Sequence, residues 1–306
     1  TLSLHMDLKE QDRFFWHTTT GWMMWNLLIG GLLIGSTQIL YDGNPGYPDL
    51  GTLWRLAEDA RITYFGVSAA YVQACMKSGI SPAKNFDLHW IRGVGVTGAP
   101  LTPEGSKWIY DEVSSNVHLG SYSGGTDMCT GFVGPCPILD VCAGEIQCRC
   151  LGNAVYAFDD EGNSILDQTG ELVITKPSPS MPIYLWGDLD GSVYNDSYFN
   201  MYPGVWRHGD WIKITSRGSC VISGRSDSTL NRDGIRMGTS EFYRVLEEME
   251  EIDDSLIVQL PGDYDKLILF LVITKMTDLD DCLITRIKTK LREELSPRHI
   301  PNQMYV

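Results

Sequence analysis

Basic residues are scarce in this chain of 306 residues. Its 24 lysines and arginines compare with 39 aspartates and glutamates, which leaves a net charge of −15 at pH 7. Proteins that bind along nucleic acids present broad basic surfaces, so the composition excludes that class. It does not exclude a small anionic ligand, because one or two arginines are enough to bind a phosphate. We therefore expect no nucleic-acid partner, and a small anionic ligand stays possible.

Long hydrophobic runs are also missing. The most apolar stretch, residues 22–40, is interrupted by Asn26 and by Ser36-Thr37-Gln38. It therefore falls short of the ~18 consecutive apolar residues that a membrane helix needs. The sequence also contains no basic segment followed by an apolar one, so it gives no indication of a secretory signal. We predict a cytosolic protein with no membrane span.

The cysteines lack the spacing of a metal site. Five of the eight lie between residues 129 and 150, but none forms a Cys-x-x-Cys pair and no spaced histidine pair accompanies them. Zinc sites normally need both the spacing and the number of ligands. We interpret the cysteines as reduced, buried thiols.

The pattern of apolar segments predicts an α/β fold of about two domains. Up to residue 121, expected strands at 39–41, 62–65, 90–96 and 117–119 alternate with helical segments. One of these helices begins at Thr102-Pro103, a capping residue followed by proline in the first turn. Strands that alternate with helices at this spacing form a parallel sheet covered on both faces.

The pattern of expected helices and strands changes twice after this region. Short strands are expected at 154–158, 171–175, 211–214 and 219–222, which indicates a small antiparallel barrel or sheet. Beyond Gly224, a helix capped by Thr239 and a closing helix from Leu283 to Leu295 accompany strands at 256–258 and 267–272. We predict a larger domain over 1–224 and a smaller α+β domain over 225–306.

The segment Gly93-Val94-Gly95-Val96-Thr97-Gly98 matches the G-x-G-x-x-G pattern of dinucleotide-binding proteins. That motif runs directly into a helix and has an acidic residue ~20 positions further on. Here Pro100 interrupts the helix, and His118-Leu119-Gly120 stands where the acid is expected. We reject this site, and with it an NAD(P)-dependent oxidoreductase. The glycines fit better a close approach of backbone to a ligand or a neighbouring strand.

Several short motifs follow one another in a characteristic order. They are Thr97-Gly98-Ala99-Pro100-Leu101, Tyr122-Ser123-Gly124-Gly125-Thr126-Asp127, Gly170-Glu171-Leu172, Trp206-Arg207-His208-Gly209-Asp210, Gly224-Arg225-Ser226-Asp227 and Asn231-Arg232-Asp233-Gly234-Ile235-Arg236. In this order the chain resembles the adenylate-forming superfamily of acyl-CoA synthetases, firefly luciferases and peptide-synthetase adenylation domains. Residues 21–26, 123–127 and 225–231 resemble the acetoacetyl-CoA synthetases within it.

The resemblance covers essentially the whole chain and implies a fold. It implies part of the large AMP-binding domain, with a parallel sheet, helices on both faces and then a small antiparallel barrel. A truncated α+β C-terminal domain follows, which would rotate about a hinge at Asp227 between two half-reactions.

The resemblance also implies an ATP-dependent ligation of acetoacetate to coenzyme A. A carboxylate attacks the α-phosphorus of ATP, which gives an acyl-adenylate and pyrophosphate, and the thiol of coenzyme A then displaces AMP. Mg²⁺ offsets the charge of the phosphates. The expected ligands are therefore ATP, Mg²⁺, coenzyme A and acetoacetate.

Two loops correspond to the nucleotide site of the family. The first would line the adenine with small residues, namely Gly98, Ala99 and Pro100. The second comprises Ser121, Tyr122, Ser123, Gly124 and Gly125. It leads to two residues expected to be catalytic. Thr126 corresponds to a threonine that hydrogen-bonds the α-phosphate, and Asp127 stands where the family usually has a Mg²⁺-binding glutamate. The shorter acid leaves direct binding, binding through water and a simple turn-capping role open.

Residues near the domain boundary correspond to further contacts. Asp210 matches the acid that accepts both ribose hydroxyls, and Arg225 matches an arginine that also contacts the ribose. Asp233 and Gly234 match a loop that approaches coenzyme A, and Arg236 matches an arginine near the phosphates. For Asp233 and Arg236, a solvated loop is an equally open interpretation.

The acyl pocket is predicted from a difference between this sequence and those of acetate-activating relatives. Acetate-activating relatives carry paired tryptophans where this chain has Ser123 and Gly124, so the missing bulk would open space for acetoacetate. On this hypothesis Gly124→Trp shifts the preference towards acetate. Other wall positions correspond to Trp22, Met23, Met24 and Thr97, although the first three would serve equally well in a core.

Two family elements are not in the sequence. The phosphate loop ending in Pro-Lys would precede Thr1, and the adenylation lysine would follow Val306. We therefore expect a fragment that is inactive alone. A synthetase of other short-chain specificity and a non-catalytic nucleotide-binding module are the alternatives.

Overall fold

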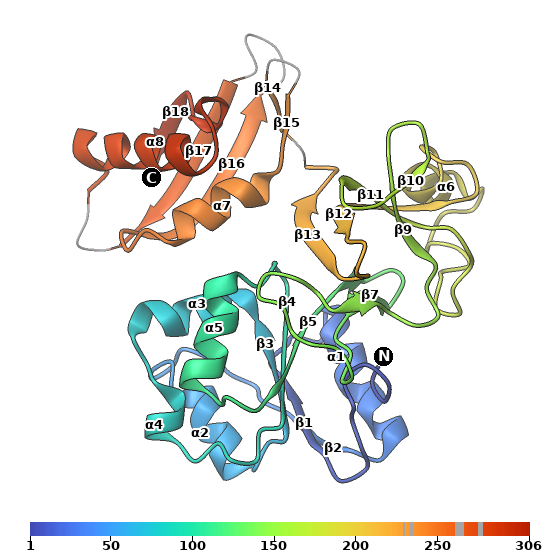
Figure 1. Cartoon of the computed structure of the whole chain (residues 1–306), viewed down its shortest axis with the longest axis vertical. Coiled ribbons are helices and arrows are strands. Elements are labelled where there is room, and N and C mark those ends of the chain that lie inside the picture. Colours follow the sequence, from blue (N-terminus) through green and yellow to red (C-terminus); the bar gives the residue numbers. More distant parts are fainter. Residues whose placement is uncertain (229, 233–234, 261–265, 275–277) are drawn as a thin grey trace. The chain divides into compact units, whose positions relative to one another are not determined.

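The computed structural model of the chain describes residues 1–306 except 229, 233–234, 261–265 and 275–277 (Figure 1). The chain divides into two compact units. Unit 1 comprises Thr1–His208 and Ile212–Ile222, and unit 2 comprises Gly209–Trp211 and Ser223–Val306. Each unit buries a hydrophobic core of its own.

A parallel sheet forms the first part of unit 1. Its strand order is β2 (Thr37–Ile39), β1 (Arg13–Trp16), β3 (Tyr64–Ser68), β4 (Gly93–Thr97) and β5 (His118–Ser121), and every neighbouring pair is parallel. The predicted parallel sheet is confirmed. Strand β1 has no counterpart among the expected strands, because its run of three apolar residues is too short to stand out from the sequence.

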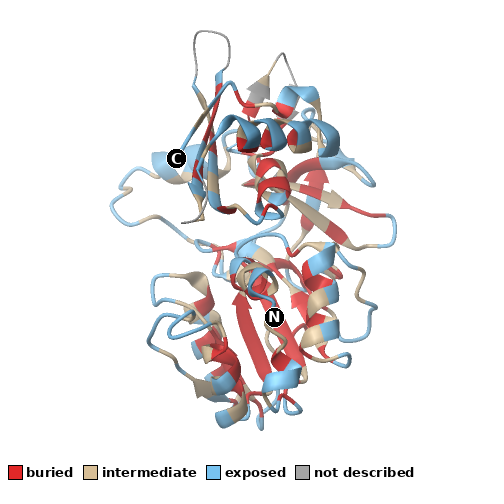
Figure 2. Ribbon diagram, turned by 90° about the vertical axis from the view of Figure 1, so that its left-hand side faces the viewer, coloured by how far each residue is buried: buried red, intermediate tan, exposed pale blue. Residues whose placement is uncertain are grey.

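Helices cover both faces of this sheet (Figure 1). On one face, α2 (Thr52–Asp59), α3 (Ala69–Ser78) and α5 (Pro103–Glu112) share a core with alternate strand residues, with α4 (Pro82–Asn85) beside α5. On the other face, α1 (Met23–Gly30) packs against the intervening residues and leads into η1 (Gly31–Ile34). Figure 2 shows the buried strands between helices whose outer sides are exposed.

Local capping follows the sequence. The side chain of Thr102 accepts a hydrogen bond from the Gly105 amide, and Pro103 occupies the first turn of α5, as predicted. Ser68 caps α3 in the same way by accepting from the Tyr71 amide. Ser68 is also the last residue of β3, whereas Thr102 lies in the loop that follows β4, so the two caps fix where a helix begins after each strand.

The glycines of the 93–98 motif make room for aromatic rings. A Cβ atom on Gly95 would lie 2.6 Å from the ring of Trp16, and one on Gly93 would lie 2.5 Å from the ring of Tyr64. Trp16 also covers Gly66, where a Cβ would lie 2.2 Å from ring carbons. The motif therefore reflects aromatic packing across neighbouring strands. The next helix begins only at Pro103, which agrees with the rejection of a dinucleotide site.

The chain between the parallel sheet and Arg225 contains two smaller sheets. One joins β6 (Ser123–Gly125), β7 (Thr130–Gly134) and β8 (Cys148–Arg149) in antiparallel pairs. The other has the order β10 (Ser164–Ile165), β9 (Val155–Phe158), β11 (Thr169–Ile174), β12 (Trp206–Ile214) and β13 (Cys220–Arg225). An isolated antiparallel bridge pairs Ile146, which precedes β8, with Cys220, the first residue of β13. Helix α6 (Ser192–Tyr198) precedes β12 in the chain.

Unit 2 is an α+β arrangement. The antiparallel pair β14 (Leu230–Arg232) and β15 (Ile235–Met237) precedes α7 (Thr239–Glu247). Strand β17 (Lys266–Ile273) then pairs antiparallel with β16 (Ile252–Leu260) and parallel with β18 (Gln303–Tyr305). Helix α8 (Asp281–Glu294) and the short η3 (Pro297–His299) lie between β17 and β18 in the chain.

The helices of unit 2 begin differently from each other. Gly238, and not Thr239, is the N-cap of α7, and no side chain caps this end. The prediction of a threonine cap is therefore wrong by one position. Asp280 caps α8 by accepting from the Leu283 amide at 2.8 Å. Leu283, Ile287 and Leu291 are buried, as their helical spacing predicts.

All eight cysteines carry free thiols. Cys75, Cys150 and Cys220 are buried, but Cys129 and Cys282 are exposed, so the expectation of buried thiols is wrong for these two. Among the described residues, no helix is both long enough and apolar enough to cross a membrane.

The packing of Trp16 on glycine gives a stability prediction. Gly66→Ala places a methyl group against the indole, and overpacking of this kind costs about 1–3 kcal/mol. We expect a lower urea midpoint for Gly66→Ala. Gly21→Ala is the matched control, because a Cβ at Gly21 would meet no atom within 4 Å. Equal midpoints for the two variants would contradict this account of the sheet.

Candidate functional site

The carboxyl ends of the parallel neighbours β4 and β5 lie at the same edge of the sheet. In open α/β folds, ligands bind outside the carboxyl edge of the sheet. Thr97, the last residue of β4, is buried, and its hydroxyl donates to the backbone oxygen of Tyr122 at 2.9 Å. Gly98 follows with a φ of +93°, which favours glycine, and Trp22 lies beside it. The structure thus brings together Thr97, Gly98, Tyr122 and Trp22 from three predicted motifs.

The side chain of Tyr122 belongs to the core. Its hydroxyl shares a hydrogen bond of 2.7 Å with that of Tyr64, and its ring packs edge-on against Trp16. Burial raises the pKa of Tyr122 well above its ordinary value, so the hydroxyl stays protonated. The backbone amide of Tyr122 donates to the oxygen of Val96 at 3.0 Å, and its oxygen accepts from Thr97, so Tyr122 fixes this edge of the sheet through both its side chain and its backbone.

The hairpin of β6 and β7 depends on glycine. Gly124 pairs with Gly131, next to an irregularity in the register, and a Cβ on Gly124 would lie 2.2 Å from the backbone oxygen of Thr130. Backbone cannot yield as a flexible side chain can. A side chain at Gly124 therefore requires the backbone of the hairpin to shift, so Gly124→Trp is expected to change the local backbone as well as the acyl pocket.

The turn between β6 and β7 carries the two residues expected to be catalytic. Thr126 and Asp127 are both exposed, and the backbone oxygen of Thr126 accepts from the Cys129 amide at 3.0 Å. The carboxylate of Asp127 accepts a hydrogen bond from the hydroxyl of Tyr198. Tyr198 lies 71 residues away in the chain, so the sequence motif contained no sign of it.

The expected acyl-wall residues of α1 differ in their surroundings. Met24 is only 5% exposed and lies in the core with Phe14, Trp16 and Leu28. Trp22 and Met23 are half-buried against the same core. Met24 is therefore a core residue, whereas Trp22 reaches Gly98 at the expected adenine loop.

In unit 2, three predicted residues form one ion-pair network. Asp210 is 6% exposed, and Nη1 of Arg225 donates to its Oδ1 at 3.1 Å. The same guanidinium contacts Asp227 through two nitrogens, with Nε donating to Oδ1 at 3.0 Å and Nη2 to Oδ2. The hydrogen bond to Asp227 is the main cause that raises the pKa of Arg225.

Gly209 is a residue of this network that sequence reasoning missed. Its φ is +85°, and its backbone oxygen accepts from the Ser226 amide at 2.7 Å. A Cβ here would lie 2.8 Å from Nη2 of Arg225 and 3.1 Å from Oδ2 of Asp227. The glycine of the Gly-Asp pair thus lets the guanidinium lie over the backbone. Only the adjacency of Gly209 to Asp210 could have indicated this role.

Two neighbouring motif residues have structural partners. Glu171, which is buried, pairs with Nε of Arg207 at 3.2 Å. The ring of His208 packs edge-on against Phe132, with centroids 4.5 Å apart, and would meet a Cβ on Gly125 at 2.7 Å. The Glu171–Arg207 pair joins β11 to β12, and the contacts of His208 hold the hairpin of β6 and β7 against β12.

Comparisons with known proteins identify relatives of the chain. No family model matches the chain. It is 42% identical over 298 residues to the acetoacetyl-coenzyme A synthetase of Rhizobium meliloti, and 42% identical over 301 residues to that of Xenopus tropicalis. Each match covers 97% of this chain. The chain is homologous to the acetoacetyl-CoA synthetases.

Solved structures extend the match to the fold. An acetoacetyl-CoA synthetase from Streptomyces lividans has a TM-score of 0.92 and 50% identity and covers 100% of this chain. The anthranilate CoA ligase AuaEII, in complex with anthranoyl-AMP, has a TM-score of 0.80 at 17% identity and covers 99% of it. The chain therefore has the fold expected for this part of an adenylate-forming enzyme. It spans about half the length of the relatives, 46% of the Rhizobium protein and 47% of the Streptomyces chain.

Three predicted residues cannot be assigned a contact. Asp233 and Gly234 lie outside the described residues. Arg236 lies in β15, opposite Asn231, but its side chain is not among those described. Their assignments near coenzyme A and the phosphates therefore remain predictions from the resemblance to acetoacetyl-CoA synthetases.

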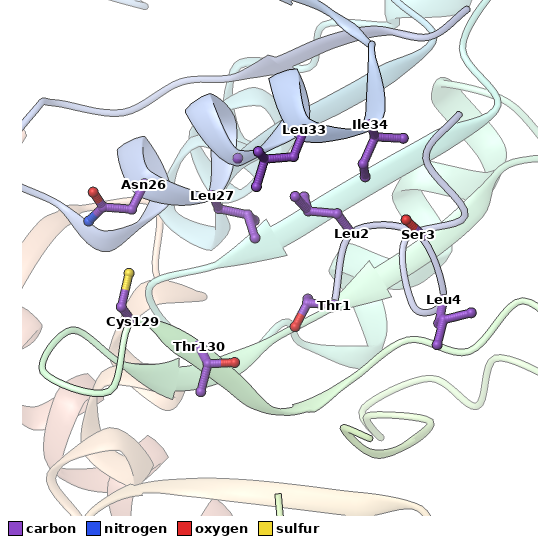
Figure 3. A pocket seen from close by; sticks show the side chains of 11 residues that line it. Thr1, Leu2, Ser3, Leu4, Asn26, Leu27, Leu33, Ile34, Cys129 and Thr130 are labelled. Atoms are coloured by element: carbon purple, nitrogen blue, oxygen red, sulfur yellow. The ribbon is translucent and has the colours of Figure 1, made fainter. Parts of the chain in front are cut away.

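One pocket of unit 1 is separate from the expected site. It has a volume of about 450 Å³ and lies between the first four residues, the helical segment α1–η1 and the start of β7 (Figure 3). Leu2, Leu27, Leu33 and Ile34 give it an apolar lining. None of the residues predicted for the binding or catalytic site lines it.

The Asp127 carboxylate fits the demands of Mg²⁺. This ion keeps several waters and binds through one or two carboxylates together with substrate phosphates. Asp127 is exposed and hydrogen-bonded through Oδ2. Within the described ranges, no cluster of three His, Cys, Asp or Glu residues could hold a metal ion. Asp127 is therefore suited to a hydrated ion bound together with a nucleotide.

The role of Gly209 can be tested by comparison with Gly204. Both have positive φ, but a Cβ at Gly204 would meet no atom within 4 Å. Alanine at either position should cost about 1–2 kcal/mol of backbone strain. We expect Gly209→Ala to lose about 1 kcal/mol more in chemical denaturation, because it also displaces a half-exposed ion pair. Identical losses would mean that the network does not depend on this glycine.

Proposed function

We propose that the protein containing this chain ligates acetoacetate to coenzyme A through an acetoacetyl-adenylate. The observation that carries the proposal is the network of Asp210 and Arg225, in a chain 42% identical to acetoacetyl-CoA synthetases. A buried carboxylate held by an arginine offers fixed acceptor oxygens, which suit the two hydroxyls of a ribose. The adenylate-forming fold supports the same reaction.

Each proposed role is the one that the resemblance to the acetoacetyl-CoA synthetases implies for the residue. The backbone at Gly98, Ala99 and Pro100 would face the adenine, and the hydroxyl of Thr126 would donate to the α-phosphate. The carboxylate of acetoacetate attacks the α-phosphorus and pyrophosphate leaves, after which the thiol of coenzyme A displaces AMP. Mg²⁺, when bound near Asp127, would offset negative charge on the phosphates.

The ion-pair network also bears on the proposed hinge at Asp227. Arg225 contacts both the proposed ribose acceptor, Asp210, and the proposed hinge residue. A ribose that draws on this guanidinium would therefore alter the contacts of Asp227. Such a link is suited to an enzyme whose small domain takes two positions in two half-reactions.

A chimera tests the proposed function. The chain would replace its counterpart in the Streptomyces acetoacetyl-CoA synthetase, to which it is 50% identical. We expect thioester formation with acetoacetate to exceed that with acetate or butyrate. Asp210→Asn should lower kcat/KM about 10- to 100-fold, because a hydrogen bond to a charged acceptor contributes roughly 1.5–3 kcal/mol.

The control variant is Asp59→Asn, at the exposed end of α2, which should leave kcat/KM unchanged. Circular dichroism and AMP binding would be measured on every variant. Preference for acetate or butyrate would replace acetoacetate by another short-chain acid. A folded chimera that binds AMP but forms no thioester would favour a non-catalytic nucleotide-binding module.

A further inference from the structure

Tyr198 connects two parts of unit 1 that are distant in sequence. It is the last residue of α6, and its hydroxyl donates to Oδ2 of Asp127 in the turn between β6 and β7. The hydrogen bond spans 71 residues. No motif that resembles the acyl-CoA synthetases includes Tyr198, so its contact with Asp127 arises from the fold alone.

The ring of Tyr198 is held firmly. It stacks on Trp206 with centroids 3.6 Å apart and an interplanar angle of 12°. Trp206 is only 1% exposed, and the rings of Tyr194 and Phe199 pack edge-on around it. The hydroxyl of Tyr198 is therefore presented to Asp127 from an aromatic cluster anchored in the core.

Asp127 needs such a partner because its surroundings restrict it little. It is exposed and lies in a short turn, where a carboxylate can rotate among several orientations. A hydrogen bond to Oδ2 selects one of them. An ionised carboxylate has about four acceptor positions, so Oδ1 and the second lone pair of Oδ2 stay available to water or a hydrated cation.

We infer that Tyr198 is a positioning residue, which orients the Asp127 carboxylate towards hydrated Mg²⁺ bound with ATP. This inference rests on the proposed function. Carboxylates that bind metals are commonly held by such outer hydrogen bonds, and loss of the outer partner typically costs 10- to 100-fold in metal affinity. The aromatic stack supplies the rigidity, and the hydroxyl supplies the orientation.

The same helix provides a matched control. Tyr194 also packs on Trp206, but its hydroxyl donates to the backbone oxygen of Pro182 at 2.6 Å. Tyr194→Phe and Tyr198→Phe thus remove the same atom from two rings of one cluster. Only the second change removes the contact with Asp127, and both retain the aromatic packing.

The experiment measures the dissociation constant of ATP by calorimetry on the chimera with the Streptomyces acetoacetyl-CoA synthetase, with saturating Mg²⁺ and with EDTA. The dissociation constant in EDTA divided by the constant in Mg²⁺ reports how much the ion strengthens ATP binding, without any catalytic turnover. For Tyr198→Phe we expect this ratio to fall about 10- to 100-fold towards unity, while the constant in EDTA is unchanged. Tyr194→Phe should have the same dissociation constants as the protein without substitutions in both conditions. For Asp127→Asn, the ratio should fall at least as far as for Tyr198→Phe.

The outcomes separate this inference from the proposed function. If Asp127→Asn lowers the ratio but Tyr198→Phe does not, Tyr198 is not a positioning residue and the metal assignment stands. If Mg²⁺ has no effect on ATP binding in the chimera without substitutions, the assignment of Asp127 is wrong, and the role of Tyr198 is wrong with it. Equal losses in Tyr198→Phe and Tyr194→Phe would indicate damage to the aromatic cluster and would also overturn the inference.

Discussion

Close packing of aromatic rings against glycine backbone is the constraint on which unit 1 depends. Trp16 lies over Gly66 and Gly95, and Tyr64 lies over Gly93, at distances that exclude any side chain. This packing lets β1, β3 and β4 approach with bulky rings on one face. The register of β4 and β5 in turn brings Thr97 to the backbone of Tyr122. The position of the proposed nucleotide loops therefore follows from glycines that contact no ligand.

The fold class could be predicted because its signals are local. Alternating apolar strands and helices indicate a parallel sheet, and residues such as Thr102 and Pro103 mark where a helix begins. Strand β1 could not be predicted because Arg13–Trp16 is short, and its place in the sheet depends on the burial of its aromatic residues. The 93–98 motif shows the converse difficulty. A glycine pattern typical of dinucleotide sites here serves Trp16 and Tyr64, and only tertiary contacts distinguish the two uses.

The candidate site was predictable only as a set of motifs. The sequence indicates Asp210, Arg225 and Asp227, and the structure joins them in one network. It could not indicate Tyr198, because nothing local relates a tyrosine to an aspartate 71 residues away. Nor could it show that Gly124 faces the backbone of Thr130, since a cross-strand clash depends on the register of the hairpin. Contacts between distant segments are the part that sequence patterns leave out.

The two carboxylates with proposed ligand contacts, Asp127 in unit 1 and Asp210 in unit 2, differ in a way that suits different tasks. Asp210 is buried and paired with a guanidinium, so its oxygens are fixed and it can serve as a stationary acceptor. Asp127 is exposed and has a neutral partner, the Tyr198 hydroxyl, which orients the carboxylate without offsetting its charge. A cation requires that remaining negative charge, whereas a ribose does not. The choice of arginine for one acid and tyrosine for the other is therefore what a sugar contact and a metal contact would each demand.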